Sequence, residues 1–355
     1  MRKLALAALM AALMAGPASA KEWPVTERDA VFKDFRFGSG ETLPELRIHY
    51  TTLGTPHRNA KGEIDNGIMV LHGTGGSGKQ FMQPQFADEL YGPGQPFDIT
   101  KYFVILPDNI GHGQSSKPSD GMRMKFPAYD YDDMVRAQHK LVTETLGIRK
   151  LQLILGTSMG CMHSFVWGET YPQNVARLAP FACNPVEIAG LNRMWRKMSV
   201  DAIKADPAWN GGNYTVQPVA GIRTAAALST VAGANPLAFQ TQYPTRAAAE
   251  DALAKAFPNR LKDDANDRIY QLESSRNYNP EPKLDTVTMP VLWINSEDDF
   301  INPPYLGIAE KQVKRMPAAR FILIPATPET KGHSTHTWAR FWKADVAKLL
   351  QTPSP

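Results

Sequence analysis

The residues best suited to do chemistry in this sequence surround a serine between two glycines, Gly156-Thr157-Ser158-Met159-Gly160. The apolar run Leu151 to Leu155 comes directly before this motif, and a segment with helical spacing follows it. In that context the motif is typical of a nucleophile elbow, a strand-to-helix turn so sharp that only glycines avoid collision two residues either side of the serine. The sequence therefore predicts that Ser158 is a nucleophile. The alternative is a plain turn in which Ser158 caps the helix.

A serine hydroxyl reacts readily only when a histidine takes its proton, and that histidine needs a carboxylate to orient it. Three carboxylates, Glu297, Asp298 and Asp299, follow the apolar run Val291 to Ile294. We predict that Asp299 is the acid, because the residues after it, Phe300 to Pro303, have the spacing usual after the acid of such a triad. Asp298 is the alternative acid. Either residue could instead be an ordinary solvated carboxylate on a loop, with no role in catalysis.

The histidine should come after the last apolar run, Phe321 to Ile324, and before the final helix, since the partners follow in the order Ser, Asp, His. Two histidines stand there, in Gly332-His333-Ser334-Thr335-His336. We predict that His333 is the base, because a Gly-His pair at this distance before the last helix is the usual arrangement. His336 is the alternative.

Acyl chemistry also needs two backbone N–H groups directed at the oxygen on which negative charge develops. The residue after the nucleophile, Met159, supplies one of them. The other should lie after the apolar run Ile68 to Leu71, in the flexible stretch His72-Gly73-Thr74-Gly75-Gly76. By its position, Thr74 is the predicted donor.

Two other kinds of site are disfavoured. Gly73 with Gly78-Lys79 nearly forms a phosphate-binding loop, but Gln80 stands where that loop needs a hydroxyl for Mg²⁺. Asp108 and His112 lack the tight, repeated spacing of metal ligands. The simpler interpretation is that they belong to a loop packed near the mouth of the site. The sequence predicts neither a cofactor nor a metal.

The overall composition is that of a globular protein, with 355 residues of which 43% are hydrophobic and 21% charged. The net charge of +4 is small and scattered, which excludes nucleic acid as an expected partner. The expected partner is a small acyl substrate. The oligomeric state, including a homodimer, stays open.

The first twenty residues have the pattern of a secretory signal peptide: Arg2 and Lys3, the apolar run Leu4 to Ala15, then Ala18-Ser19-Ala20. We predict cleavage after Ala20 and a periplasmic or secreted protein. No later stretch approaches the roughly eighteen apolar residues that a membrane anchor needs. Export would permit a disulfide, but spacing does not decide whether the only two cysteines, Cys161 and Cys183, pair.

The site residues are separated by an alternation of short apolar runs and helical stretches, which indicates a mostly parallel, doubly wound α/β sheet. An antiparallel pair, Val31 to Phe37 and Leu46 to Leu53, opens the chain. The six buried runs are Ile68–Leu71, Tyr102–Leu106, Leu151–Leu155, Leu178–Ala182, Val291–Ile294 and Phe321–Ile324, and the clearest helices are Asp132–Leu146, Met159–Thr170 and Trp338–Leu350.

One long segment breaks this alternation. Residues 184–285 contain several helical pieces and no strong strand pattern. We predict that they form a cap inserted into an α/β core made of 21–183 and 286–355, over the carboxyl ends of the strands, where such sheets bind ligands.

Three separated motifs resemble the homoserine O-acetyltransferase family of α/β-hydrolase-fold proteins. They are Ser158–Met162 with Trp167 and Tyr171-Pro172, Asp133–Gln138, and Asp206–Tyr214. The resemblance runs from about Val31 to the C-terminus. It implies an α/β-hydrolase fold, a Ser158, Asp299, His333 triad, and a two-step transfer through an acyl-enzyme.

The sequence departs from that family at two informative positions. The family generally has an aspartate after the catalytic histidine and an arginine in the cap, which hold the amino acid substrate by its charged ends. Ser334 follows His333 here, and an ungapped reading places Ala226 at the arginine position, with Arg223 nearby as a substitute. Loss of those ionic partners disfavours homoserine as the substrate.

The sequence thus leads to one main hypothesis, an exported serine hydrolase that cleaves a carboxylic ester through an acyl-serine intermediate. An O-acyltransferase of the homoserine O-acetyltransferase type shares the first half of this chemistry and is the first alternative. A non-catalytic binding protein on the same fold is the second.

Overall fold

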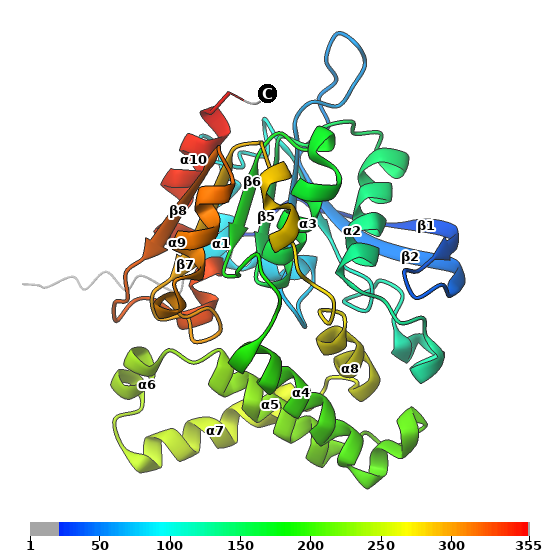
Figure 1. Ribbon diagram of the computed structural model, residues 1–355, viewed down its shortest axis with the longest axis vertical. Helices are drawn as coiled ribbons and strands as arrows, with labels where there is room; N and C mark the ends of the chain where they lie inside the picture. Colours follow the sequence, from blue (N-terminus) through cyan, green and yellow to red (C-terminus); the bar gives the residue numbers. More distant parts are fainter. Residues whose placement is uncertain (1–20, 354–355) are drawn as a thin grey trace, which may run out of the picture.

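In the computed structural model of the protein (Figure 1), the described residues are 21–353, of which 256–260 are described by their backbone alone. The predicted signal peptide lies outside the described residues. Within residues 21–353 one sheet of eight strands forms the centre of the molecule. The strands are β1 Thr26–Arg36, β2 Thr42–Leu53, β3 Gly67–Leu71, β4 Phe103–Pro107, β5 Leu153–Thr157, β6 Leu178–Phe181, β7 Val291–Ser296 and β8 Ala319–Ile324.

The strand order across the sheet is β1-β2-β4-β3-β5-β6-β7-β8. The pairs β1–β2 and β2–β4 are antiparallel, and the remaining neighbours are parallel. Strands β3 to β7 are buried along their whole length, because helices cover both faces of a parallel sheet. The predicted antiparallel pair and all six predicted runs are confirmed as strands. Burial along the whole strand is wrong for the sixth run, Phe321–Ile324, because β8 is an edge strand of the sheet and only its last residue is buried.

Alternate residues of the central strands pack on opposite faces of the sheet. Met69 and Ile154 belong to the core shared with helices α2 Tyr131–Lys140, α3 Met159–Thr170 and α9 Ile308–Gln312. Ile68 and Leu153 belong to the core shared with α1 Pro84–Leu90 and α10 Lys343–Gln351.

Two predicted helices differ from the structure at their ends. The stretch predicted as Asp132–Leu146 is α-helical only to Lys140 and continues as one π-helical turn, Leu141–Thr145. The stretch predicted as Trp338–Leu350 begins with the 3₁₀ turn Ala339–Phe341, and α10 starts after Trp342. The indole N–H of Trp342 donates to the carbonyl of His336, which fixes the chain at that break.

The segment between β6 and β7 contains five α-helices and no strand in its described residues. They are α4 Gly190–Ala205, α5 Val219–Ala232, α6 Pro236–Gln242, α7 Arg246–Arg260 and α8 Ala265–Glu273. Figure 1 shows them as a layer apart from the sheet. The layer has its own apolar core, which includes Trp195, Ile203 and Ile222. The domain limits 184 and 285 stay a prediction.

Helices α4 and α5 lie close together because of one glycine. A Cβ atom on Gly221 would stand 2.6 Å from the carbonyl oxygen of Ala202 and from the Cα of Ile203, closer than packed atoms come. No helix within 21–353 combines the length and the apolar character needed to cross a bilayer.

Candidate active site

Ser158 sits at the turn between β5 and α3 in a backbone conformation that non-glycine residues rarely adopt, with φ 55° and ψ −111°. A Cβ on Gly156 would lie 1.9 Å from the carbonyl oxygen of Gly160, and one on Gly160 would lie 2.1 Å from that of Leu71. Both glycines are therefore required by contact with backbone. The strain is placed at the one residue whose side chain must stand clear of the sheet.

The three predicted triad residues form a continuous chain of hydrogen bonds. His333 Nε2 lies 2.8 Å from Ser158 Oγ, and His333 Nδ1 lies 2.8 Å from Asp299 Oδ2. Ser158 follows β5, Asp299 follows β7 and His333 follows β8, so the sheet brings together residues that are up to 175 positions apart.

The Asp299 carboxylate is 1% exposed and is held by more than the histidine. It accepts from the backbone N–H of Ile301 at 2.8 Å and from the side-chain amide of Asn302 at 3.0 Å. Burial alone would raise the pKa of this carboxyl, but the charge of His333 and these hydrogen bonds outweigh burial and hold the pKa below its ordinary value. Asp299 is therefore ionised whenever His333 needs a negative partner.

The alternative acid, Asp298, takes no part in the hydrogen bonds that join Ser158, His333 and Asp299, and its environment is different. Its Oδ2 accepts from the amide of Asn235 at 2.6 Å, the hydroxyl of Thr330 at 2.7 Å and the backbone N–H of Gly332 at 3.1 Å, and its Oδ1 accepts from Ser296. Asp298 thus ties the cap to the loop that carries His333.

The alternative base, His336, makes no hydrogen bond with Ser158 within the described residues. Its ring packs edge-on against that of His333, with centroids 5.2 Å apart. Burial, and then the charge of His333, lower the pKa of His336 to about 3. His336 is therefore neutral near pH 7 and lines the site, but it is not the hydrogen-bond partner of Ser158.

In the predicted oxyanion loop, residues 72–76, the peptide that joins Gly73 to Thr74 is held by hydrogen bonds to its carbonyl oxygen. His72 Nδ1 lies 2.9 Å from the carbonyl oxygen of Gly73, which also accepts from the N–H of Gly76 at 3.0 Å. Because the two polar groups of a trans peptide point in opposite directions, these bonds turn the N–H of Thr74 away from them. Thr74 lines the same cavities as Ser158. The backbone of Met159 starts α3 beside the serine.

Sequence reasoning missed the buried polar side chains beneath this loop. His72 Nε2 accepts from the backbone and side chain of Asn109, and Gln138 in turn donates to the side chain of Asn109. Gln138 also accepts from the indole of Trp167 at 2.8 Å. No local signal in the sequence could have found this network, because its members lie on four separate segments.

The two disfavoured sites have structural roles. Asp108 Oδ1 accepts from the N–H of Gly78 at 2.7 Å and its Oδ2 from that of Gln114 at 2.8 Å, so the carboxylate joins two loops. Gly78–Met82 forms a 3₁₀ turn, not the α-helix that follows a phosphate-binding loop.

Two cavities meet at Ser158. One has a volume of about 670 Å³ and the other about 480 Å³, and Thr74, Ser158, His333 and Ser334 line both. Cap residues on α4, α5 and α6 contribute to the wall of the second, including Trp195, Ser229 and Phe239. The cap helices thus form part of the wall of the second cavity, whose volume suits a small or medium ligand.

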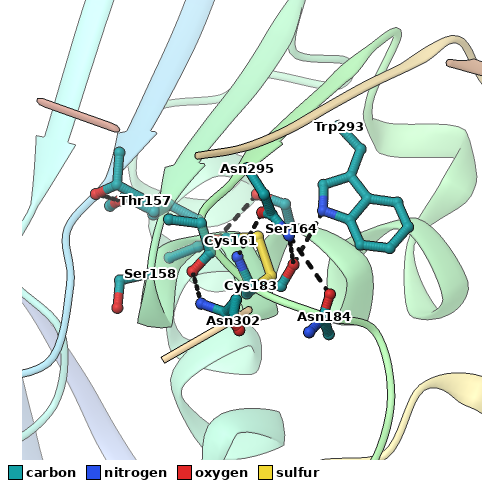
Figure 2. The surroundings of a disulfide bond; sticks show 12 residues. Thr157, Ser158, Cys161, Ser164, Cys183, Asn184, Trp293, Asn295 and Asn302 are labelled. Carbon is teal, nitrogen blue, oxygen red and sulfur yellow. Dashed lines mark hydrogen bonds between the residues drawn. A yellow bond between two sulfur atoms is a disulfide. The ribbon is translucent and has the colours of Figure 1, made fainter. Parts of the chain in front are cut away.

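The two cysteines, whose pairing the sequence left open, form a disulfide near Ser158 (Figure 2). Cys161 lies in the first turn of α3, and Cys183 follows β6; neither side chain is exposed. The backbone of Cys183 is bound by Trp293 and Asn295 of β7. The disulfide therefore joins α3, which begins directly after Ser158, to the segment after β6. That segment is in turn hydrogen-bonded to β7, the strand that precedes Asp299.

Removal of this disulfide is expected to cost stability. The bridge closes a loop with a sequence separation of 22 residues, for which restriction of the unfolded chain contributes about 3 kcal/mol. The double variant Cys161→Ala/Cys183→Ala should therefore lose about 3 kcal/mol of unfolding free energy in urea denaturation. Wild type measured in a reductant serves as the matched control and should fall by a similar amount. A double variant as stable as the oxidised wild type would show that the bridge contributes nothing.

Buried histidines predict how stability depends on pH. Burial, and then the charge of His72, lower the pKa of the fully buried His163 to about 3. Between that value and the ordinary 6.5 the unfolded chain binds a proton that the folded chain does not, so stability falls as the pH falls through this range. At pH 5 the loss for this histidine is about 2 kcal/mol.

Urea unfolding at pH 7 and pH 5 measures this loss. His163→Gln should show a smaller drop between the two pH values than wild type, because glutamine does not titrate. Equal drops in both proteins would mean that His163 does not contribute.

Comparisons with known proteins agree on the architecture. The alpha/beta hydrolase fold family matches residues 67–328. A homoserine O-acetyltransferase from Solidesulfovibrio magneticus is 30% identical over 288 residues, which cover 74% of this chain and 68% of that protein.

Solved structures give the same result. The homoserine O-acetyltransferase of Bacillus anthracis superposes with a TM-score of 0.82 at 23% identity, over 93% of this chain and 99% of that one. An acetylester hydrolase of Corynebacterium glutamicum superposes with a TM-score of 0.81 at 20% identity, over 92% and 96%. At these identities the likeness shows the shared fold, and the predicted fold class is confirmed.

Proposed function

This chain belongs to the alpha/beta hydrolase fold family, and from that premise we propose that it cleaves carboxylic esters through an acyl-serine intermediate. The observation that carries the proposal is the hydrogen-bonded chain from Ser158 Oγ through His333 to Asp299. A serine on a strained turn, bound to a histidine that a buried carboxylate orients, is suited to acyl chemistry.

In the first step His333 Nε2 takes the proton of Ser158 as its oxygen attacks the ester carbonyl. Asp299 stabilises the imidazolium that forms. The N–H groups of Thr74 and Met159 donate to the oxygen that becomes negatively charged. The intermediate then collapses, the alcohol leaves with the proton from His333, and the acyl group stays on Ser158.

The second step decides between hydrolysis and transfer, because either water or an alcohol can take the acyl group. The homoserine O-acetyltransferase relative supports transfer. The site supports hydrolysis: Ser334 stands where a homoserine-binding aspartate is expected, and no Asp or Glu among residues 21–353 lines either cavity at Ser158. An ammonium group would lack an ionic partner there, so water is the proposed acceptor and an O-acyltransferase is the second candidate.

The test supplies p-nitrophenyl acetate with and without homoserine and measures free acetate and O-acetylhomoserine. We expect the same yield of acetate in both reactions. O-acetylhomoserine formed at the expense of acetate would favour the transferase. Absence of p-nitrophenol release in both reactions, from folded protein, would refute the esterase proposal.

We also propose that the protein is exported. The disulfide between Cys161 and Cys183 supports this, because such bonds persist in oxidising compartments and are rare in the cytosol. N-terminal sequencing of protein from a periplasmic or culture fraction should begin at Lys21. Full-length protein retained in the cytosol would contradict export.

A further inference from the structure

The charged side chains that line the second cavity all have the same sign. Three cationic side chains line it, Arg196 on α4, Arg268 on α8 and Lys331 in the histidine loop. Among residues 21–353 it has no carboxylate in its wall. Ser158 and His333 line the same cavity, so the cations share it with the proposed reacting groups.

Arg196 is the most informative of the three because it is 2% exposed. Its guanidinium donates to Asn192 at 3.0 Å and to Ser275 at 3.4 Å, and it lies 5.0 Å from the ring of Trp195. These partners are neutral, and no ion pair joins Arg196 to a carboxylate of the described chain. A desolvated cation without a counter-charge is costly, and a bound anion would remove that cost.

The other two cations lie on separate segments, Lys331 in the loop that carries His333 and Arg268 on α8. Lys331 precedes His333 by two positions, and its ammonium lies 5.3 Å from the ring of Trp338. Arg268 donates to Ser229 at 2.8 Å and so connects α8 to α5. Asp263 shares a smaller recess with Arg268, but it is exposed and lines neither cavity at Ser158.

The remaining wall of the cavity is partly aromatic. Trp195, Phe239 and Trp338 line it together with the cations. A substrate that fits has a short apolar part for these rings and a carboxylate for the cations.

We propose that the ester cleaved by this protein carries a carboxylate, bound in the second cavity by Arg196, Lys331 and Arg268. The inference rests on the proposed esterase function and names its substrate class: a monoester of a dicarboxylic acid or an acylated hydroxy acid. For a dicarboxylic monoester, water replaces the alcohol at the acyl carbon, and the products are the dicarboxylate, the free alcohol and one proton. A zwitterionic amino acid fits less well, since its ammonium would face cations.

The test compares two pairs of esters at pH 7.5 by titration of released acid. Monoethyl glutarate against ethyl pentanoate places the carboxylate on the acyl side, and 4-acetoxybutanoate against butyl acetate places it on the alcohol side. We expect at least one anionic ester to have a kcat/KM about tenfold above its neutral partner, the effect of one good charge pair. Equal kcat/KM values in both pairs would overturn the inference while leaving the esterase function in place.

Variants assign that preference to residues. Lys331→Gln and Arg196→Gln should each lower the ratio of anionic to neutral kcat/KM about tenfold. Lys348→Gln, which removes an exposed lysine of α10, is the matched control and should keep the wild-type ratio. Circular dichroism checks folding, and Lys331→Gln decides the question if the buried Arg196→Gln protein does not fold. A wild-type ratio in Lys331→Gln would count against the site.

A binding measurement separates this inference from the proposed function. Calorimetric titration of glutarate into Ser158→Ala protein should show binding that Lys331→Gln in the same background weakens about tenfold. Glutarate binding without turnover of any ester would support the carboxylate site and refute the esterase. No glutarate binding would overturn the site.

Discussion

Ser158→Ala is expected to lower kcat about 10⁵-fold with p-nitrophenyl acetate, because the nucleophile is lost and only the oxyanion donors and binding remain. The fold should persist. Among the described residues the Ser158 hydroxyl bonds only to His333, and alanine would occupy the same backbone conformation with a side chain of similar reach. Unchanged circular dichroism and a loss of labelling by a fluorophosphonate would accompany the loss of turnover.

A second buried serine on the same helix provides the control. Ser164 lies in α3, and its hydroxyl donates to the carbonyl of Gly160 at 2.9 Å. Ser164→Ala removes one local hydrogen bond and should leave kcat within a few-fold of wild type. If Ser158→Ala keeps substantial turnover, another residue is the nucleophile and the mechanism above is wrong.

Asp299→Asn should lower kcat about 10⁴-fold. Its carboxylate accepts from His333 Nδ1 at 2.8 Å, whereas an asparagine amide can turn its N–H₂ toward that nitrogen and stabilise the wrong tautomer. Because the pKa of Asp299 is held below its ordinary value, the charge is present throughout the neutral range. The loss should therefore be similar at pH 7 and pH 8.

Asp298→Asn is the matched comparison, one residue away and also a carboxylate. Its bonds to Thr330 and Gly332 position the histidine loop without touching His333, so we expect a loss of about tenfold, mainly in kcat. A larger loss from Asp298→Asn than from Asp299→Asn would reverse the assignment of the acid. Steady-state kinetics of the two purified variants distinguishes these outcomes.

Local pattern was enough to predict most of the fold and the three residues that form the hydrogen-bonded chain at Ser158. The glycines around Ser158 are imposed by contacts with the neighbouring backbone, so they stand in the sequence as a readable motif. The central strands are buried on both faces and therefore appear as continuous apolar runs. The first five residues of β1, Thr26 to Ala30, were missed because four of them are exposed and polar.

What could not be predicted depends on contacts between distant segments. The pairing of Cys161 with Cys183 follows from α3 packing beside the end of β6, which spacing does not encode. The role of Asp298 depends on Asn235 and Thr330, which belong to other loops. In the sequence Arg196 looks like one more surface cation, and only its burial in the wall of a cavity shared with Ser158 distinguishes it.

The two connections of the helical layer meet at one place on the core. Asn184 lies where the chain leaves the core after β6, and Tyr278 lies where it returns before β7. The hydroxyl of Tyr278 donates to the carbonyl of Asn184 at 3.2 Å, and Arg193 of α4 pairs with Glu273 of α8 at 3.4 Å. Because its ends are adjacent and it holds none of the three predicted triad residues, we expect this layer to be exchangeable between relatives as one unit. Chimaeras carrying the layer of a relative should inherit that donor's selectivity and retain the host's bond-breaking apparatus, provided the graft keeps an amide where Asn235 now stands.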